Sequence, residues 1–225
     1  IRKLFIPSDG SLLISADYNQ IELRVLAEDI FRRTNDRTML DIFLDGKLDI
    51  HTQTASKMYG VPYDQVGDGD LRKDAKIINF GLVYGMTEYG LARDLKCTKE
   101  EAIEKRNAHF RYHKGVPPWM RAVQEEAVSR GYATTLIGRR RYFPSPPEDF
   151  GSEWEEKTWW DGIRRQAMNT PIQGTAADII KLAMTENWKQ IRDFALQLLQ
   201  VHDELLSEAP EDVAELSAEI TQNTM

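Results

Sequence analysis

Two aspartates stand where strand-like sequences end or turn. Asp17 follows the apolar run SLLISA (11–16), and Asp203 lies inside ALQLLQVHDELLSEAP (195–210), which reads as a strand, a turn and a strand. If both strands belong to one sheet, the two carboxylates lie close together, and they can both stay ionised only around a cation. Spacing alone favours a simpler interpretation, in which one acid is an exposed turn residue and the other is a helix cap.

The type of cation follows from the ligands that the chain offers. The sequence contains one cysteine and four histidines without a Cys–His cluster, so a site built on Asp17 and Asp203 would have hard oxygen ligands. Such ligands favour Mg²⁺ or Mn²⁺ over zinc. Two ions held by shared carboxylates can clamp the attacking and leaving oxygens of an in-line phosphoryl transfer.

The segment LRKDAKIINFGLVY (71–84) predicts a helix of several turns. Every fourth residue falls on one slowly twisting stripe, which consists of Arg72, Lys76, Phe80 and Tyr84. Two cations one turn apart suit a polyphosphate, and the Phe80 ring offers a flat surface for a sugar or base. Glycine lowers helix stability, so Gly81 and Gly85 indicate a close approach to the backbone by a ligand or by a packed helix. An amphipathic helix with solvated cations and a buried Phe80 is the simpler alternative.

The remaining pattern describes the elements that must position these residues. Helices are expected over 20–30, 46–60, 99–130 with a break at 115–118, and 163–192. A β-hairpin is expected over 131–144 with Gly138 at its turn, and the Pro-rich, acidic stretch 145–162 reads as an exposed loop or surface insertion. Strands distant in sequence then have to form one sheet, which predicts an α+β fold.

Composition is that of an ordinary globular protein, with 41% hydrophobic and 29% charged residues among 225. No stretch approaches the roughly 20 apolar residues that cross a bilayer. The single Cys97 excludes an intramolecular disulfide and suits a reducing compartment. A net charge of −7 argues mildly against a nucleic-acid partner. However, basic clusters at 71–76, 137–142 and 163–166 can bind phosphates, unless they are solvated helix faces.

Three longer segments resemble the motifs of the family A DNA polymerases, the bacterial DNA polymerase I type. SADYNQIELRVLA (15–27) resembles motif A, RKDAKIINFGLVYG (72–85) motif B, and LQVHDEL (199–205) motif C. Similar flanking segments lie at 49–60, 131–144 and 164–184. The motifs follow the family order at family-like spacings and cover most of the chain. Lys73 and Asp74 depart from the motif B pattern, and Asp74 would weaken the positive field unless it faces solvent.

The resemblance implies a right-hand polymerase fold with an antiparallel palm sheet and a mostly helical fingers subdomain. The palm is expected at 1–30, with motif A, and at 164–225, with motif C. The fingers are expected at 31–163, with motif B, the hairpin and the acidic loop. A thumb and an exonuclease domain are expected to be absent, so the chain is expected to be a fragment of a larger enzyme.

The resemblance also implies residue roles. Asp17, Asp203 and the Tyr18 carbonyl would hold the metal ions, with Glu204 in a supporting role, and Lys76 would neutralise or protonate the departing pyrophosphate. The incoming nucleotide would be contacted by Gln20, Glu22, His51, Arg72, Lys76, Phe80 and Tyr84. Among these, Glu22 would exclude the ribose 2′-hydroxyl. Primer and minor-groove contacts would come from Arg165, Asn169, Gln173 and His202. Minor-groove acceptors are nearly independent of sequence, as a copying enzyme requires.

The activity implied is that of a DNA-templated DNA polymerase acting in replication or repair. Two Mg²⁺ ions, or Mn²⁺, would assist attack of a primer 3′-hydroxyl on the α-phosphate of a dNTP, with release of pyrophosphate. The expected partners are primer-template DNA and dNTPs, with no membrane. A monomer in the cytoplasm is expected, or in the host cytoplasm if the protein is phage-encoded.

Three alternatives remain open at this stage. His202 and Asp203 suggest an HD-type metal phosphohydrolase, but that class needs further His and Asp ligands on helices. A single-subunit RNA polymerase shares the fold plan, but an acid at Glu22 should exclude ribonucleotides. The third alternative is a fragment that binds DNA or nucleotides without turning over.

Overall fold

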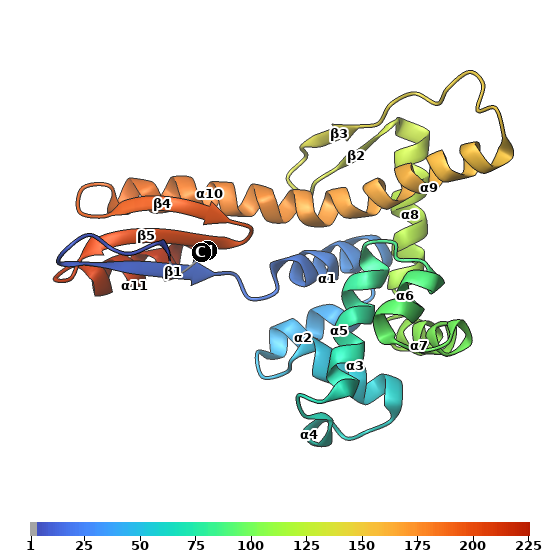
Figure 1. The fold of residues 1–225 in the computed structure, drawn as a ribbon, viewed down its shortest axis with the longest axis horizontal. Coiled ribbons are helices and arrows are strands. Elements are labelled where there is room, and N and C mark those ends of the chain that lie inside the picture. The colour runs from blue at the N-terminus through green and yellow to red at the C-terminus, as the bar shows by residue number, and fades with distance from the viewer. Residues whose placement is uncertain (1–3) are drawn as a thin grey trace. The chain divides into compact units, whose positions relative to one another are not determined.

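The computed structural model describes residues 4–225, which divide into two compact units (Figure 1). One unit combines the segment up to Glu22 with residues 173–225, and the other spans 23–172. Residues 23–30 and 164–172 therefore cluster with the second unit, inside the ranges expected for the palm. None of the helices formed by the described residues combines the length and the apolar character that crossing a membrane requires.

The first unit is built on a three-stranded antiparallel sheet in the order β1-β5-β4. These strands are β1 (Ser11–Asp17), β4 (Leu196–Val201) and β5 (Glu204–Pro210), as the apolar runs predict. The register places Asp17 opposite Glu204 and Leu13 opposite Glu208. The sheet thus joins the two ends of the sequence, which confirms the α+β prediction.

Two helices cover one face of this sheet. Helix α11 (Ala214–Thr224) packs against β1 and β5, while α10 (Thr175–Ile191) packs against α11 and β4. Alternate residues of β5 are buried beneath them, beginning with Leu205, because successive side chains of a strand point to opposite faces. The other set, which includes Glu204, faces away from this core.

The second unit is mostly helical and carries a two-stranded hairpin. Its helices are α1 (Ile21–Thr34, beginning in the first unit), α2 (Thr38–Asp45), α3 (Ile50–Tyr59), α4 (Tyr63–Val66), α5 (Asp70–Val83), α6 (Glu88–Leu95), α7 (Lys99–Tyr112), α8 (Val116–Arg130) and α9 (Glu153–Asn169). The hairpin pairs β2 (Tyr132–Thr134) with β3 (Arg140–Tyr142). Gly138 between them has φ +95°, which confirms the predicted turn.

Local signals explain where several helices begin and end. The Asp49 carboxylate accepts a hydrogen bond from the Thr52 N–H at the start of α3, and Gly60 ends that helix in the left-handed conformation. At the start of α7, Thr98 and Glu101 form a reciprocal capping box. The helices predicted over 46–60 and on both sides of 115–118 are therefore confirmed, although the first begins only at Ile50.

The prediction of a loop over 145–162 is wrong from residue 153 onwards. Helix α9 begins at Glu153 and continues into the helical segment that was expected to start at 163. The Ser152 side chain accepts from the Glu155 N–H, and three acids in the first turn, Glu153, Glu155 and Glu156, favour the positive end of the helix dipole. The acidic composition that suggested a loop thus begins a helix.

Two further features were not anticipated. A π-helical turn (Thr170–Gly174) separates α9 from α10 inside the region predicted as one helix. A short helix, α6, follows α5 and packs with α7 around buried Ile78, Leu82 and Leu91. This cluster anchors one side of α5 and so holds the stripe residues of that helix in place.

Candidate functional site

The end of the β1-β5-β4 sheet brings together the two aspartates expected to hold metal. Asp17 is the last residue of β1, and Asp203 lies in the tight turn between β4 and β5. The Tyr18 N–H donates to the Asp203 carbonyl oxygen over 3.2 Å. This bond ties the residue after Asp17 directly to Asp203. The turn also requires a left-handed residue, His202, with φ +58°.

Glu204 lies beside this pair but has its own partner. Its carboxylate accepts a hydrogen bond from the Ser15 hydroxyl over 2.5 Å. Ser15 and Asp17 share one face of β1 because they are two residues apart in a strand, and Glu204 is directly opposite Asp17. Asp17 and Glu204 therefore share a face of the sheet, away from the helices that cover its other side.

Glu22 interacts electrostatically with Asp203 and His202. Burial raises the pKa of the Glu22 carboxyl, the negative charge of Asp203 raises it further, and His202 lowers it. Glu22 stands in the first turn of α1, where an acid is favoured by the helix dipole. Gln20, just before this helix, has φ +58° and redirects the chain out of β1. The path from β1 into α1 thus places Glu22 close enough to Asp203 for the charges to interact.

The donor set at the sheet end fits magnesium. Among residues 4–225, no group of three or more His, Cys, Asp or Glu side chains is close enough to hold a metal ion. Mg²⁺, however, is usually bound by only one or two carboxylates together with water and substrate phosphates. Asp17, Asp203 and the Tyr18 carbonyl would supply such a set, and ligands that are all oxygen atoms suit Mg²⁺ better than zinc.

A second group of predicted residues lies on α3 and α5 in the other unit. The His51 and Phe80 rings are 5.6 Å apart between centroids, and Phe80 stacks on Tyr84 at 6.3 Å with an interplanar angle of 17°. Lys76 is exposed, and no carboxylate of residues 4–225 forms an ion pair with it. Along the stripe, the two cations come first, and the two aromatic rings follow them.

The two glycines of motif B are explained by close packing. A Cβ on Gly85, which has φ +69°, would lie 2.7 Å from the Met168 side chain and 2.9 Å from that of Arg165 on α9. A Cβ on Gly81 would come within 3.1 Å of the Met86 sulfur. Of the two explanations that the sequence left open, packing against neighbouring side chains is the one found in the second unit.

Arg72 is held by a residue that sequence reasoning missed. Its Nε lies 3.0 Å from Asp49 Oδ1, and the same oxygen accepts from Thr52 N and Thr52 Oγ1 at 2.8 and 2.9 Å. Burial alone would raise the pKa of Asp49, but the bonds from Thr52 and the Arg72 guanidinium lower it to about 2. The signal in the sequence was Asp49 in the N-cap position before α3.

Replacing Asp49 by alanine is expected to cost about 1–2 kcal/mol of unfolding free energy, because the cap and the Arg72 partner are both lost. Since the folded pKa of Asp49 is depressed to about 2, its contribution is full above about pH 4 and is lost as the pH falls towards 2. Urea unfolding at pH 7 and pH 3 measures both effects.

The control for this prediction is Asp41→Ala. Asp41 forms an exposed pair with Arg37, four residues before it, and such pairs contribute about 0.5 kcal/mol or less. Equal losses for the Asp49 and Asp41 variants, or a loss for Asp49→Ala that does not shrink at pH 3, would contradict the assignment.

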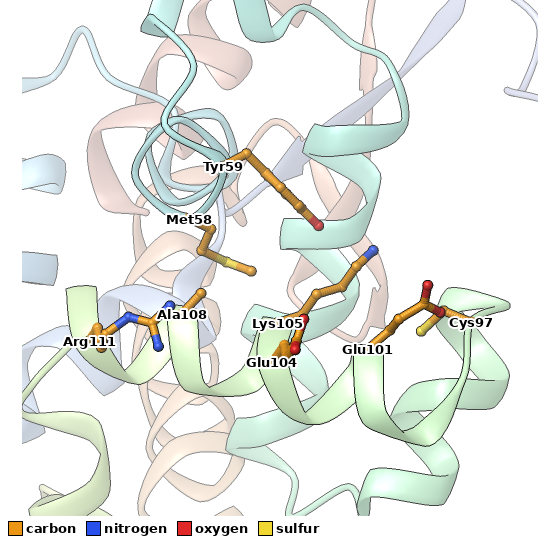
Figure 2. A pocket seen from close by; sticks show the side chains of 8 residues that line it. All are labelled: Met58, Tyr59, Cys97, Glu101, Glu104, Lys105, Ala108 and Arg111. Atoms are coloured by element: carbon orange, nitrogen blue, oxygen red, sulfur yellow. The ribbon is translucent and has the colours of Figure 1, made fainter.

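Asp74, which departs from the motif B pattern, is mostly buried, and its charge is paired. It accepts from the Tyr59 hydroxyl over 2.9 Å and pairs with Lys105. Burial, and then the Asp74 hydrogen bond, raise the pKa of Tyr59 to about 12. Figure 2 shows Tyr59 and Lys105 turned towards one another at a hollow of about 360 Å³. Lys105 compensates the acid, and none of the predicted site residues lines this hollow.

The residues expected to contact DNA are divided between the two units. Arg165 and Asn169 lie on α9, with Arg165 exposed and the Asn169 Oδ1 atom buried without a partner among residues 4–225. Gln173 is exposed in the π-helical turn, and His202 is exposed in the β4–β5 turn. Each unit therefore contributes polar side chains of the type that contact nucleic acid.

Comparison with known proteins agrees with the motifs. The family model for DNA polymerase family A matches residues 1–225. The chain is 42% identical to "DNA polymerase I, thermostable" of Thermus aquaticus over 226 residues, covering 100% of this chain and 26% of the relative. It is also 42% identical to DNA polymerase I of Geobacillus stearothermophilus over 229 residues, covering 100% of this chain and 25% of the relative.

A solved structure is similar over the whole chain. It is described as the POL domain of Pol1 from M. smegmatis in complex with DNA primer-template and dNTP. The TM-score is 0.86 at 36% identity, with 100% of this chain and 38% of that chain covered. The present chain spans about a quarter of the length of the curated relatives named above. On the family match, the relatives and the fold together, the chain belongs to DNA polymerase family A.

Proposed function

We propose that this chain carries the nucleotidyl-transfer site of a DNA-templated DNA polymerase, which adds dNTPs to a primer 3′-hydroxyl and releases pyrophosphate. The observation that carries the proposal is the sheet end at which Asp17 and Asp203 meet, tied by the Tyr18–Asp203 backbone hydrogen bond, in a chain of this family. The solved relative was described with primer-template DNA and dNTP, the partners proposed here.

Asp17, Asp203 and the Tyr18 carbonyl would hold the divalent ions. When bound, such ions neutralise charge at the attacking and leaving oxygens of the phosphoryl transfer. The protein contributes the rigidity of the site. The hairpin and its pairing with β1 hold the two aspartates without rearrangement, and Glu204 is restrained by Ser15 on the same face.

The stripe on α5 would hold the nucleotide. Arg72 and Lys76 would bind the triphosphate, and the exposed Lys76 ammonium would give a proton to departing pyrophosphate. Phe80 and Tyr84, stacked on one another, would contact the sugar and base. Because Asp49 already pairs with Arg72, the guanidinium is oriented before a phosphate arrives.

The side chains Arg165, Asn169, Gln173 and His202 would contact the primer and the minor groove. Asparagine and glutamine can donate to purine N3 and pyrimidine O2, which occupy similar positions in every base pair. Contacts of this kind test the geometry of the pair without selecting a sequence. Action as a monomer in the cytoplasm stays a prediction.

Primer extension by the 225-residue chain tests the proposal. With a labelled primer-template, MgCl₂ and four dNTPs, we expect template-dependent lengthening that chelation of the metal abolishes. Retention of DNA or dATP without any extension, at all protein concentrations, would favour the binding-only alternative. Extension with rNTPs at a rate equal to that with dNTPs would favour the RNA polymerase alternative.

Replacing Glu22 by alanine is expected to raise ribonucleotide incorporation relative to dNTP incorporation about 10- to 100-fold. The half-buried Glu22 side chain is close enough to Asp203 for their charges to interact, which puts it beside the proposed metal site. Replacing this side chain by a methyl group would leave room there for a 2′-hydroxyl. Single-nucleotide insertion with matched rNTP and dNTP measures the ratio. Glu28→Ala, which removes a partly exposed acid from the same helix, is the control and should leave the ratio unchanged. Unaltered sugar selectivity in the Glu22 variant would count against this role.

A further inference from the structure

A buried chain of polar side chains connects α7 to His51. The His109 Nε2 atom lies 2.9 Å from Asn79 Oδ1, and Asn79 Nδ2 lies 3.1 Å from His51 Nδ1. Asn79 Nδ2 is also 3.4 Å from Thr54 Oγ1. His109 and His51 are each 2% exposed, and Asn79 is 1% exposed. These bonds link helices α7, α5 and α3 within the second unit.

We propose that His109 is a positioning residue that acts through Asn79 to hold His51 in the tautomer with its proton on Nε2. His51 then presents an N–H donor to a phosphate oxygen of the incoming nucleotide. The inference rests on the proposed function, because it adds His51 to the side chains, Arg72 and Lys76, that are proposed to bind the triphosphate. It adds a residue, His109, that lies on a different helix from the stripe and outside the three motifs.

The unpartnered Nδ1 atom of His109 shows which group donates in the hydrogen bond between His109 and Asn79. The Nδ1 atom of His109 is buried and makes no hydrogen bond within residues 4–225. Complete burial and the neighbouring His113 lower the pKa of His109 well below its usual value, so the ring is neutral and carries one proton. A buried N–H without an acceptor is rarer than an unsatisfied acceptor. The proton therefore lies on Nε2 and is donated to Asn79 Oδ1.

This direction determines the orientation of the Asn79 amide. With Oδ1 facing His109, the NH₂ group faces His51 Nδ1 and Thr54 Oγ1. His51 Nδ1 must then accept a hydrogen bond, and it can do so only when it carries no proton. A neutral His51 ring consequently bears its proton on Nε2, because the hydrogen bond made by one ring nitrogen determines which nitrogen carries the proton.

The charge state of His51 is consistent with this tautomer. Burial lowers the pKa of His51, Asp49 raises it, and Arg72 and Lys76 lower it again, to about 4. The ring is therefore neutral at pH 7. No hydrogen bond joins His51 Nε2 to another described residue, and Nε2 is not among the fully buried atoms that lack a partner, so the Nε2–H remains available to a ligand. The positive charge for a phosphate would come from Arg72 and Lys76, and His51 would add a directed neutral donor.

The test begins with the tautomer of His51. The sequence contains four histidines, so ¹⁵N-histidine labelling and long-range ¹H–¹⁵N correlation spectra can resolve every ring. In the unsubstituted protein at pH 7, we expect His51 to carry its proton on Nε2. A proton on His51 Nδ1 would overturn the inference without the need for any variant.

The decisive variant is His109→Phe, which keeps an aromatic ring but removes the donor to Asn79. The Asn79 amide is then free to reverse, and we expect a mixture of His51 tautomers. Loss of one directed hydrogen bond is expected to weaken dATP binding, titrated with MgCl₂, about fivefold. His109→Gln supplies an amide donor and should restore both the tautomer and the affinity.

A matched control is the residue that follows α7, one turn beyond His109. His113 is 1% exposed, like His109, but its Nε2 bonds to Thr54 Oγ1 at 2.9 Å instead of to Asn79. His113→Phe should leave the His51 tautomer and the dATP affinity unchanged. Equal effects of the two phenylalanine variants would show that only packing matters and would overturn the inference. If His109→Phe does not fold, the spectrum of the unsubstituted protein and that of His109→Gln still decide.

The two proposals fail in different ways. Intact dATP binding with the wrong His51 tautomer would overturn this inference and leave the proposed function standing. The expected tautomer without any dATP binding would overturn the nucleotide role of His51 together with the proposed function.

Discussion

Replacing Asp203 by asparagine is expected to lower primer extension at least about a thousandfold, which corresponds to about 4 kcal/mol of transition-state stabilisation. Asparagine keeps the size of the side chain and suits the turn, but it removes the charge that would hold a divalent ion. The turn itself should survive, because the Tyr18 N–H bonds to the backbone carbonyl of Asp203 and not to its carboxylate. The expected loss is therefore one of catalysis with DNA binding retained.

Single-turnover extension and a DNA-binding titration on the same preparation measure the two quantities. The control is Glu208→Ala, which removes an acid from the same strand, β5, at the position opposite Leu13. Glu208 bonds to the Ser8 N–H and has no part in the proposed site, so extension should continue at its usual rate. Near-normal extension by Asp203→Asn would refute the metal-ligand role of Asp203.

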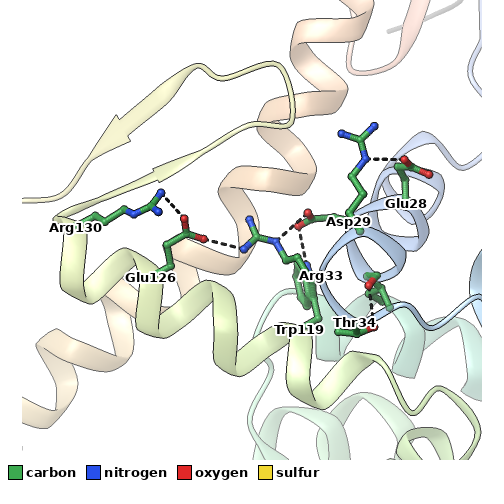
Figure 3. Close-up of polar contacts among 9 residues, drawn as sticks. Glu28, Asp29, Arg33, Thr34, Trp119, Glu126 and Arg130 are labelled. Atoms are coloured by element: carbon green, nitrogen blue, oxygen red, sulfur yellow. Dashed lines mark hydrogen bonds and ion pairs between the residues drawn. The ribbon is translucent and has the colours of Figure 1, made fainter.

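The largest expected effect on stability comes from Asp29→Ala. Asp29 is 3% exposed and accepts hydrogen bonds from Trp119 Nε1 at 2.7 Å and from Arg33 Nε at 2.9 Å (Figure 3). Arg33 also bonds to Glu126 on α8. Removing Asp29 leaves the buried Trp119 N–H without its acceptor, while Arg33, whose side chain is 27% exposed, keeps Glu126 as a partner. The expected cost is about 2–3 kcal/mol, because the lost hydrogen bonds are buried and involve a charged acceptor.

Urea unfolding followed by circular dichroism measures this loss, and the neighbouring residue provides the control. Glu28 precedes Asp29 on α1, but the side chains of its pair with Arg32 are 36% and 58% exposed. Glu28→Ala should therefore change stability by about 0.5 kcal/mol or less. Comparable losses for the two variants would mean that the Asp29–Trp119 bond does not hold α1 to α8.

Local patterns predicted most of the elements. The apolar runs at 11–16 and 195–210 are strands, and α5 covers the predicted stripe apart from Tyr84, which follows the last helical residue. The error at α9 arose because acids, prolines and tryptophans were taken together as the signature of a loop. In the structure, residues 145–151 are irregular and include two prolines and two of the acids, while Ser152 and the acids from Glu153 onwards begin a helix, where capping and the dipole favour them.

Only the residues of the candidate site that lie within the family motifs or the similar flanking segments could be predicted from the sequence. Asp17 and Asp203 could be paired only through the resemblance, since spacing alone favoured two unrelated acids. Their backbone connection through Tyr18 spans almost the entire sequence, and no periodicity can encode it. The partners of the motif residues were not predictable at all. Asp49 could be read only as a residue at the start of a helix, and its ion pair with Arg72 could not be foreseen. In the same way, nothing in the pattern of residues 99–130 indicated that His109 would contact Asn79.

The sequence by itself determined the family, the order of the three motifs and the limits of most helices, because these depend on residue type and on neighbours within a few positions. The tertiary structure alone decided which polar groups meet. Asp29 meets Trp119 across 90 positions, and His109 reaches His51 through Asn79. The reason is physical, since a buried polar group must find a partner wherever packing brings one, and packing joins residues that have no relation in sequence.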